Sequence, residues 1–157
     1  MRVLIQRVKN SSVSIKGTCV GKIKQGLLLF VGFENDDCHD DIVWIAKKIV
    51  QLRVFEDVSG VMNLSISDLN ASRSYNKPGI MVISQFTLYA STKKGNRPSF
   101  LRAAAPNIAI PLYEAFIIEI TSLFHGCVET GQFGAEMEVE LINDGPVTLW
   151  IDSKNKE

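Results

Sequence analysis

Residues 26–33, Gly-Leu-Leu-Leu-Phe-Val-Gly-Phe, form a run that is apolar at nearly every position. A strand with one face in water would alternate apolar and polar side chains. The unbroken run therefore predicts a strand that is buried on both faces. Such a strand needs covering elements on each side, and the segments around it carry the patterns expected of them.

Shorter strand patterns precede this run. Residues 2–8 and residues 12–16 are each expected to form a strand, and Lys16-Gly17 predicts a hairpin turn into a third strand over residues 18–23. Consecutive strands joined by short turns usually pair with one another. The opening quarter of the chain is therefore predicted to be a β-meander.

Two helices are predicted further along the chain. Apolar residues recur at helical spacing over residues 41–52, and Asp40 or Asp41 is the expected N-cap. A second apolar stretch predicts a helix that has Pro111 in its first turn and ends at His125-Gly126, with the glycine in a left-handed cap. The remaining strands are expected at residues 52–56, 80–90, 137–142 and 147–151, with exposed loops at 70–79 and 91–102.

The length and composition match one ordinary globular domain. The chain has 157 residues, of which 46% are hydrophobic and 22% charged, and the formal net charge is zero. We expect a single α/β domain over residues 1–152 and a short polar C-terminal tail over residues 153–157. Three cysteines without a CxxC pair fit a reducing, cytoplasmic location, and no apolar run is long enough to cross a membrane.

The charges are segregated although they sum to zero. Residues 69–113 contain six cations and no Asp or Glu, whereas residues 114–157 are strongly acidic. A basic loop with Lys93, Lys94 and Arg97 at its centre could bind phosphates locally. The alternative is that these cations pair with the acidic C-terminal segment in the folded protein.

The available chemistry is limited. His39 lies in an acidic stretch and His125 at a predicted helix end, so neither is a good candidate for a Ser-His-Asp or Cys-His arrangement. The ligand spacing of a zinc or calcium site and the glycine motifs of nucleotide-binding loops are missing from the sequence. We therefore expect neither a metal nor a cofactor.

Two polar insertions interrupt otherwise apolar strands. Ser84, Gln85 and Thr87 fall in the predicted strand 80–90, and such groups need partners when they are buried. A half-exposed edge strand would account for them equally well. The second insertion, residues 143–146 (Asn-Asp-Gly-Pro), is typical of a tight turn between two strands.

Taken together, the motifs resemble the D-aminoacyl-tRNA deacylase family, long called D-tyrosyl-tRNA deacylases. SQFTL at residues 84–88 and NDGPVT at residues 143–148 are the most specific of them. The others follow in order along nearly the whole chain: residues 2–8, 27–32, 53–55, 62–64, 94–100 and 130–133. The resemblance implies mixed, largely antiparallel, barrel-like β-sheets flanked by two main helices, and a homodimer.

The resemblance also implies the site. Catalytic roles fall to Ser84, Gln85, Phe86 and Thr87, tRNA binding to the basic loop, and substrate binding to the following residues: Gly145, Pro146, Arg7 and Met137. A cis Gly145-Pro146 bond of one subunit would face the SQFT segment of the other and leave no room for an L side chain, while Arg7 holds this dipeptide in place.

The implied reaction is hydrolysis of the ester bond of D-aminoacyl-tRNA, with glycyl-tRNA mischarged on a non-cognate tRNA as a further candidate substrate. Main-chain N–H groups around Gln85, Phe86 and Thr87 would stabilise the oxyanion, and Thr87 would orient the ester or the attacking water. Thr87 as a covalent nucleophile is the competing mechanism. A non-catalytic RNA-binding dimer of the same fold is the alternative function.

Overall fold

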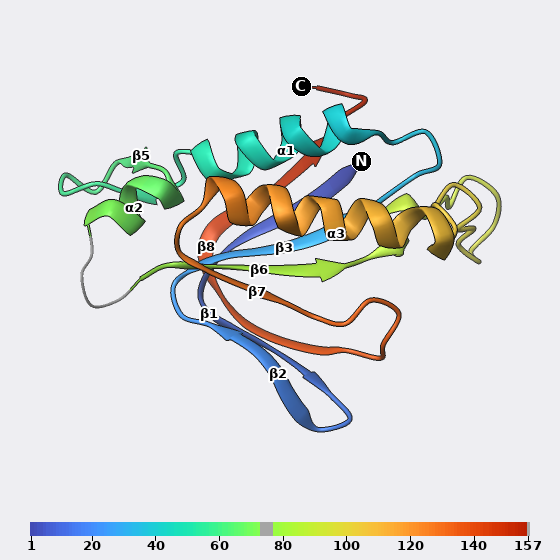
Figure 1. Ribbon diagram of the computed structural model, residues 1–157, viewed down its shortest axis with the longest axis horizontal. Coiled ribbons are helices and arrows are strands. Elements are labelled where there is room, and N and C mark those ends of the chain that lie inside the picture. Colours follow the sequence, from blue (N-terminus) through green and yellow to red (C-terminus); the bar gives the residue numbers. More distant parts are fainter. Residues whose placement is uncertain (73–76, 157) are drawn as a thin grey trace.

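The computed structural model describes residues 1–72 and 77–156 as a curved mixed sheet with two long helices packed on one face (Figure 1). The strand order is β2-β1-β3-β6-β7, and β8 pairs with the other side of β1. The strands are β1 (Arg2–Ile15), β2 (Thr18–Ile23), β3 (Gly26–Gly32), β6 (Gly79–Ser84), β7 (Cys127–Thr130) and β8 (Glu138–Asp152). The expected α/β architecture is confirmed.

The strand over the apolar run is central, as predicted. It pairs antiparallel with β1 and parallel with β6. Leu27, Leu29 and Val31 face the main core beneath the helices, whereas Leu28 faces a second, smaller core on the opposite side of the sheet. These two cores explain why nearly every position of the run is apolar.

The predicted β-meander is wrong. The strands expected at residues 2–8 and 12–16 are one long strand, β1, and β3 pairs with its first half while β2 pairs with its second half. The hairpin turn at Lys16-Gly17 is present, and both residues have positive φ. The long strand bends between its halves, which lets one strand serve both cores.

The C-terminal strands also differ from the prediction. The segments expected at 137–142 and 147–151 fall in a single strand, β8, that pairs antiparallel with β1 on both sides of a register shift. Gln6 is opposite Thr148 and Val8 is opposite Asn143, so four β8 residues face one β1 residue. Residues 143–146 are therefore part of an irregularity within a strand and not a hairpin turn.

The two main helices are α1 (His39–Gln51) and α3 (Pro106–Leu123), and they lie side by side over the sheet (Figure 1). The N-cap of α1 is Cys38, and Asp41 is the third helical residue, whose carboxylate accepts the Cys38 N–H at 2.9 Å. Pro106 and not Pro111 occupies the first turn of α3, so Pro111 lies in the interior of the helix at an exposed position.

Gly126 has no left-handed conformation, contrary to the prediction. A Cβ at this position would overlap the ring of Phe124, so the glycine is needed for close packing. The small elements are β4 (Phe55–Glu56), β5 (Met62–Leu64) and α2 (Ile66–Ser72). Helix α2 overlaps the start of the loop expected at 70–79, of which residues 73–76 lie outside the described residues.

Candidate active site

The SQFT segment is located where β6 ends. The strand predicted over residues 80–90 stops at Ser84, and residues Phe86–Tyr89 form a short 3-10 helix, η1. The Gln85 N–H donates to the Val31 carbonyl at 2.7 Å, which fixes the segment to the carboxyl end of β3. This is the edge at which parallel strands commonly present functional groups.

Gly32 allows η1 to pack closely against β3. A Cβ at Gly32 would lie 2.8 Å from the Gln85 carbonyl oxygen and 3.2 Å from the Leu88 Cβ. Any larger residue would therefore displace the backbone of the SQFT segment. No role was expected of Gly32 from the sequence, although its place at the end of an apolar strand is typical of close backbone approach.

Two main-chain donors are free at the start of η1. Within the described chain, the N–H groups of Phe86 and Thr87 donate to no acceptor, because they precede the first turn of the helix. The Gln85 N–H differs from these two donors, because it already donates to the Val31 carbonyl. The Gln85 side-chain amide instead donates to the Thr87 hydroxyl at 2.5 Å.

A cavity of about 310 Å³ opens beside this segment. Ser84, Gln85 and Phe86 form one wall, and Met137 and Phe133 lie among the mostly apolar residues of the others. None of the residues that line the cavity has an ionisable side chain. Chemistry in this space therefore depends on main-chain groups, hydroxyls and amides.

Gly145 and Pro146 lie away from this cavity in the same chain. Their peptide bond is cis and both residues are exposed. Arg7, opposite them on β1, pairs with Leu27, whereas Ser84 pairs with Val31 four residues further along β3. At about 3.3 Å per residue, the two segments are separated by roughly 13 Å along the sheet.

Arg7 contacts Asp144, the residue that precedes the Gly-Pro dipeptide. Its side chain is 5% exposed, and its Nε lies 3.1 Å from both the main-chain oxygen and the Oδ2 of Asp144. Its Nη1 donates to the Val54 carbonyl. Asn143 adds further contacts, because its Nδ2 donates to the Arg7 carbonyl at 3.0 Å and to the Val147 carbonyl at 3.3 Å.

The basic loop is exposed and open. Lys93, Lys94 and Arg97 are exposed, and no ion pair within the described residues includes them. The loop is closed at its base by two hydrogen bonds between Ser91 and Ser99. The alternative that these three cations pair with the acidic C-terminal segment therefore does not hold within this chain.

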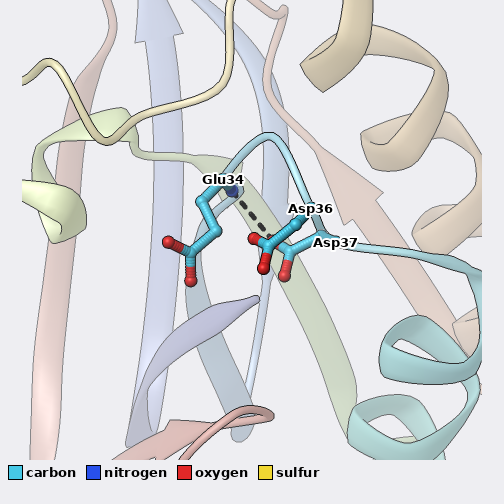
Figure 2. Close-up of side chains that lie close together, drawn as sticks. All are labelled: Glu34, Asp36 and Asp37. Atoms are coloured by element: carbon cyan, nitrogen blue, oxygen red, sulfur yellow. Dashed lines mark hydrogen bonds between the residues drawn. The ribbon is translucent and has the colours of Figure 1, made fainter.

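One acidic cluster has a spacing that could hold a metal ion: Glu34, Asp36 and Asp37 (Figure 2). Protein cations and N–H groups already use two of these carboxylates. Asp37 accepts the terminal ammonium of Met1 and the Glu34 N–H, and Glu34 pairs with Arg102. Burial raises the pKa of Asp37, and the hydrogen bond from the ammonium opposes this change. Two of the three carboxylates therefore already have partners in the protein, and Asp37 holds the terminal ammonium of Met1.

A model of the family described as D-Tyr-tRNA(Tyr) deacylase matches residues 4–152 of this sequence. The chain belongs to this deacylase family. Its curated relatives include D-aminoacyl-tRNA deacylases from Bacteroides fragilis (strain YCH46), 54% identical, and Akkermansia muciniphila, 51% identical; each match covers 100% of both chains. The resemblance stated from the motifs is thereby confirmed.

Solved structures support the same fold. The structure titled "c-Myc DNA Unwinding Element Binding Protein" superposes with a TM-score of 0.88 at 32% identity and covers 97% of this chain and 98% of its own. A probable eukaryotic D-amino acid tRNA deacylase superposes with a TM-score of 0.78 over 96% of this chain and 97% of its own, and at 14% identity it supports the fold alone. No described helix of this deacylase is both long and apolar enough to span a membrane.

Proposed function

We propose that this protein hydrolyses the ester bond of D-aminoacyl-tRNA and releases a free D-amino acid and tRNA, with mischarged glycyl-tRNA as a second substrate. One observation carries the proposal: Phe86, whose main-chain N–H is free, lines a cavity that has no ionisable side chain in its lining, and the free N–H of Thr87 belongs to the next residue of the same segment. This arrangement fits an enzyme of the deacylase family that works without a catalytic triad.

The mechanism follows from the reactivity of the substrate. An aminoacyl ester is activated, so the reaction needs stabilisation of the developing oxyanion more than a strong base. Preorganised N–H donors each contribute a factor of about 10²–10³ to such a step. The N–H groups of Phe86 and Thr87 take this role, Thr87 orients the ester or the attacking water, and a ribose hydroxyl of the substrate assists in activating that water.

Chiral selection in this proposal requires a second copy of the chain. Gly145 and Pro146 are exposed and lie about 13 Å along the sheet from the SQFT segment of their own chain, so a partner subunit has to bring its own Gly-Pro segment there. Their carbonyl groups then meet the amino group of a D-aminoacyl moiety, and the close approach leaves no space for an L side chain. Met137 borders the cavity in which the substrate binds.

The experiment that tests the function compares D-tyrosyl-tRNA with L-tyrosyl-tRNA at equal concentration in the presence of the purified protein. We expect release of the amino acid from the D form only. Binding of both forms without release would instead support a non-catalytic RNA-binding dimer. The solution mass of the same preparation tests the homodimer, and a monomer that keeps full D selectivity would contradict the proposed role of the second copy.

The basic loop should govern substrate binding and not chemistry. Replacement of Lys93, Lys94 and Arg97 by alanine is expected to raise KM about tenfold at low salt and to leave kcat within about twofold, because phosphate contacts act by charge. The salt dependence of kcat/KM should also become less steep. As a control, alanine at three other exposed cations, Lys22, Lys47 and Lys48, should leave KM unchanged; an equal rise in KM there would contradict local binding.

Thr87→Ala distinguishes the two mechanisms. If Thr87 only orients the ester or the water, the free N–H groups remain and kcat falls about tenfold while hydrolysis stays measurable. Thr87→Ser, which keeps the hydroxyl, should retain most of the activity. Complete loss in Thr87→Ala, together with an acyl-enzyme trapped by rapid quenching of the parent, would establish Thr87 as a covalent nucleophile instead.

A further inference from the structure

The 3-10 helix η1 is too short for its internal hydrogen bonds to fix its position. It contains four residues, and a helix of this type has poor internal hydrogen-bond geometry and leaves its last carbonyls without helical partners. Its start is fixed by Val31 and Gly32, as described above. Its end needs a separate anchor if the Phe86 and Thr87 N–H groups are to keep one orientation.

Arg2 supplies a contact at that end. Its Nη1 donates to the Leu88 carbonyl at 3.0 Å, across a separation of 86 residues in the chain. Its Nε donates to Asp152 Oδ2 at 2.7 Å, and the Arg2 side chain is 19% exposed. Because two different nitrogens bind two different partners, the guanidinium is fixed in orientation as well as in position.

Tyr89 provides a platform for this guanidinium. Its ring is fully buried, and the Arg2 guanidinium carbon lies 4.5 Å from the ring centroid. The Tyr89 hydroxyl is buried without a hydrogen-bond partner, although a buried hydroxyl normally has one. The guanidinium therefore contacts the ring of Tyr89 and not its hydroxyl.

Arg102 reaches the same ring from the end of the basic loop. Its guanidinium carbon lies 5.6 Å from the Tyr89 centroid, and its Nη2 lies 3.2 Å from Glu34. Two cations thus contact one aromatic ring of η1, one from the first strand and one from the loop assigned to tRNA.

We propose that Arg2 is a positioning residue for the deacylation reaction, which holds the end of η1 through the Leu88 carbonyl and the Tyr89 ring and so orients the Phe86 and Thr87 N–H groups. This inference rests on the proposed function of the SQFT segment. Arg2 does not line the substrate cavity, so it acts through the segment and not on the substrate.

Arg2→Lys is the decisive variant, because lysine keeps the charge but has a single nitrogen that cannot serve Leu88 and Asp152 in this geometry. We expect kcat for D-tyrosyl-tRNA to fall about tenfold or more and KM to stay within about twofold. Arg53→Lys is the matched control. Arg53 also donates to a main-chain carbonyl, that of Asn63 at 2.8 Å, but in the β4–β5 region at the far end of the molecule from the 91–102 loop (Figure 1).

A pair of variants at Tyr89 tests the platform. Tyr89→Phe removes only the unpartnered hydroxyl and should leave kcat unchanged, whereas Tyr89→Leu removes the aromatic face and should lower kcat as Arg2→Lys does. Three results would overturn the proposal. The kcat values of Arg2→Lys and Arg53→Lys could be equal, Arg2→Lys could change KM alone, or kcat in both variants could fall in proportion to the melting temperature.

Amide hydrogen exchange gives a readout that does not depend on activity. Arg2→Lys should speed the exchange of the Leu88 and Ala90 amides, which donate within the turn to Gln85 and Thr87, and should leave the Gln85 amide protected by Val31. Unchanged exchange at Leu88 and Ala90 overturns the inference. If the parent protein releases no D-tyrosine, the proposed function fails while the exchange result still decides the role of Arg2.

Discussion

Gly32→Ala should lower kcat for D-aminoacyl-tRNA by a factor of about 100 or more, because displacement of a catalytic group by about 1 Å can cost that much. The new Cβ would lie 2.8 Å from the Gln85 carbonyl oxygen and 3.3 Å from the Tyr89 ring. The first distance is shorter than a normal Cβ contact, and the second is tighter than most such contacts. The first contact is with a main-chain atom, which cannot rotate away as a side chain can. The SQFT segment must therefore shift relative to β3, and steady-state kinetics would measure the loss.

Gly79→Ala is the control for this variant. Its Cβ would meet Ile23 at 2.7 Å, so it overpacks the smaller core, but it lies at the start of β6, five residues before Ser84. Overpacking of either site should cost about 1–3 kcal/mol of unfolding free energy. We expect Gly79→Ala to lose stability and keep kcat; an equal fall of kcat in both variants would show that the effect of Gly32→Ala is only structural.

Arg7→Ala should have the second largest effect, on both stability and selectivity. It leaves the Val54 carbonyl and the Asp144 carboxylate without their partner in a largely buried environment, which should cost about 3 kcal/mol of unfolding free energy. The Gly145-Pro146 segment loses its anchor at the same time. We expect the ratio of kcat/KM for D-tyrosyl-tRNA over L-tyrosyl-tRNA to fall at least about tenfold.

Arg7→Lys separates charge from geometry. Lysine keeps a cation near Asp144 but cannot also reach Val54 with the arginine fork, so stability should recover in part while selectivity stays reduced. Denaturant unfolding measures the first quantity and paired deacylation assays the second. Selectivity equal to that of the parent in both Arg7 variants would contradict the anchoring role.

The sequence predicted the elements better than their pairing. The apolar run at residues 26–33 identified a strand that is buried on both faces, and the helix spacing at 41–52 identified α1 to within two residues. The pairing of β3 with β1 instead of with β2 was not predictable from local pattern, because the sequence does not show that residues 2–15 form one strand that serves two cores. Helix α2 was missed although Ser65 and Asp68 cap its start.

The candidate site was predictable by motif but not by geometry. The apolar residues on either side of Ser84 and Gln85 predict one continuous strand over residues 80–90, so the change to a 3-10 helix after Ser84 depends on the contacts of Gly32 and Val31. The free N–H groups of Phe86 and Thr87 follow from that change. Arg2 and Tyr89 were beyond sequence reasoning because they are 87 positions apart in the sequence and meet only through the fold.

The pairing of β1 with β8 affects how the enzyme becomes active during synthesis on the ribosome. Arg2 meets a residue 150 positions later in the chain, and Arg7 meets Asp144 only when β8 has emerged. In the nascent chain β1 can pair with β3 early, but the long-range pairing of β1 with β8 must wait until the last strand has been synthesised. Prematurely terminated products therefore lack the Gly145-Pro146 segment. If that segment selects the D form as proposed, unfinished chains should show no stereoselective hydrolysis.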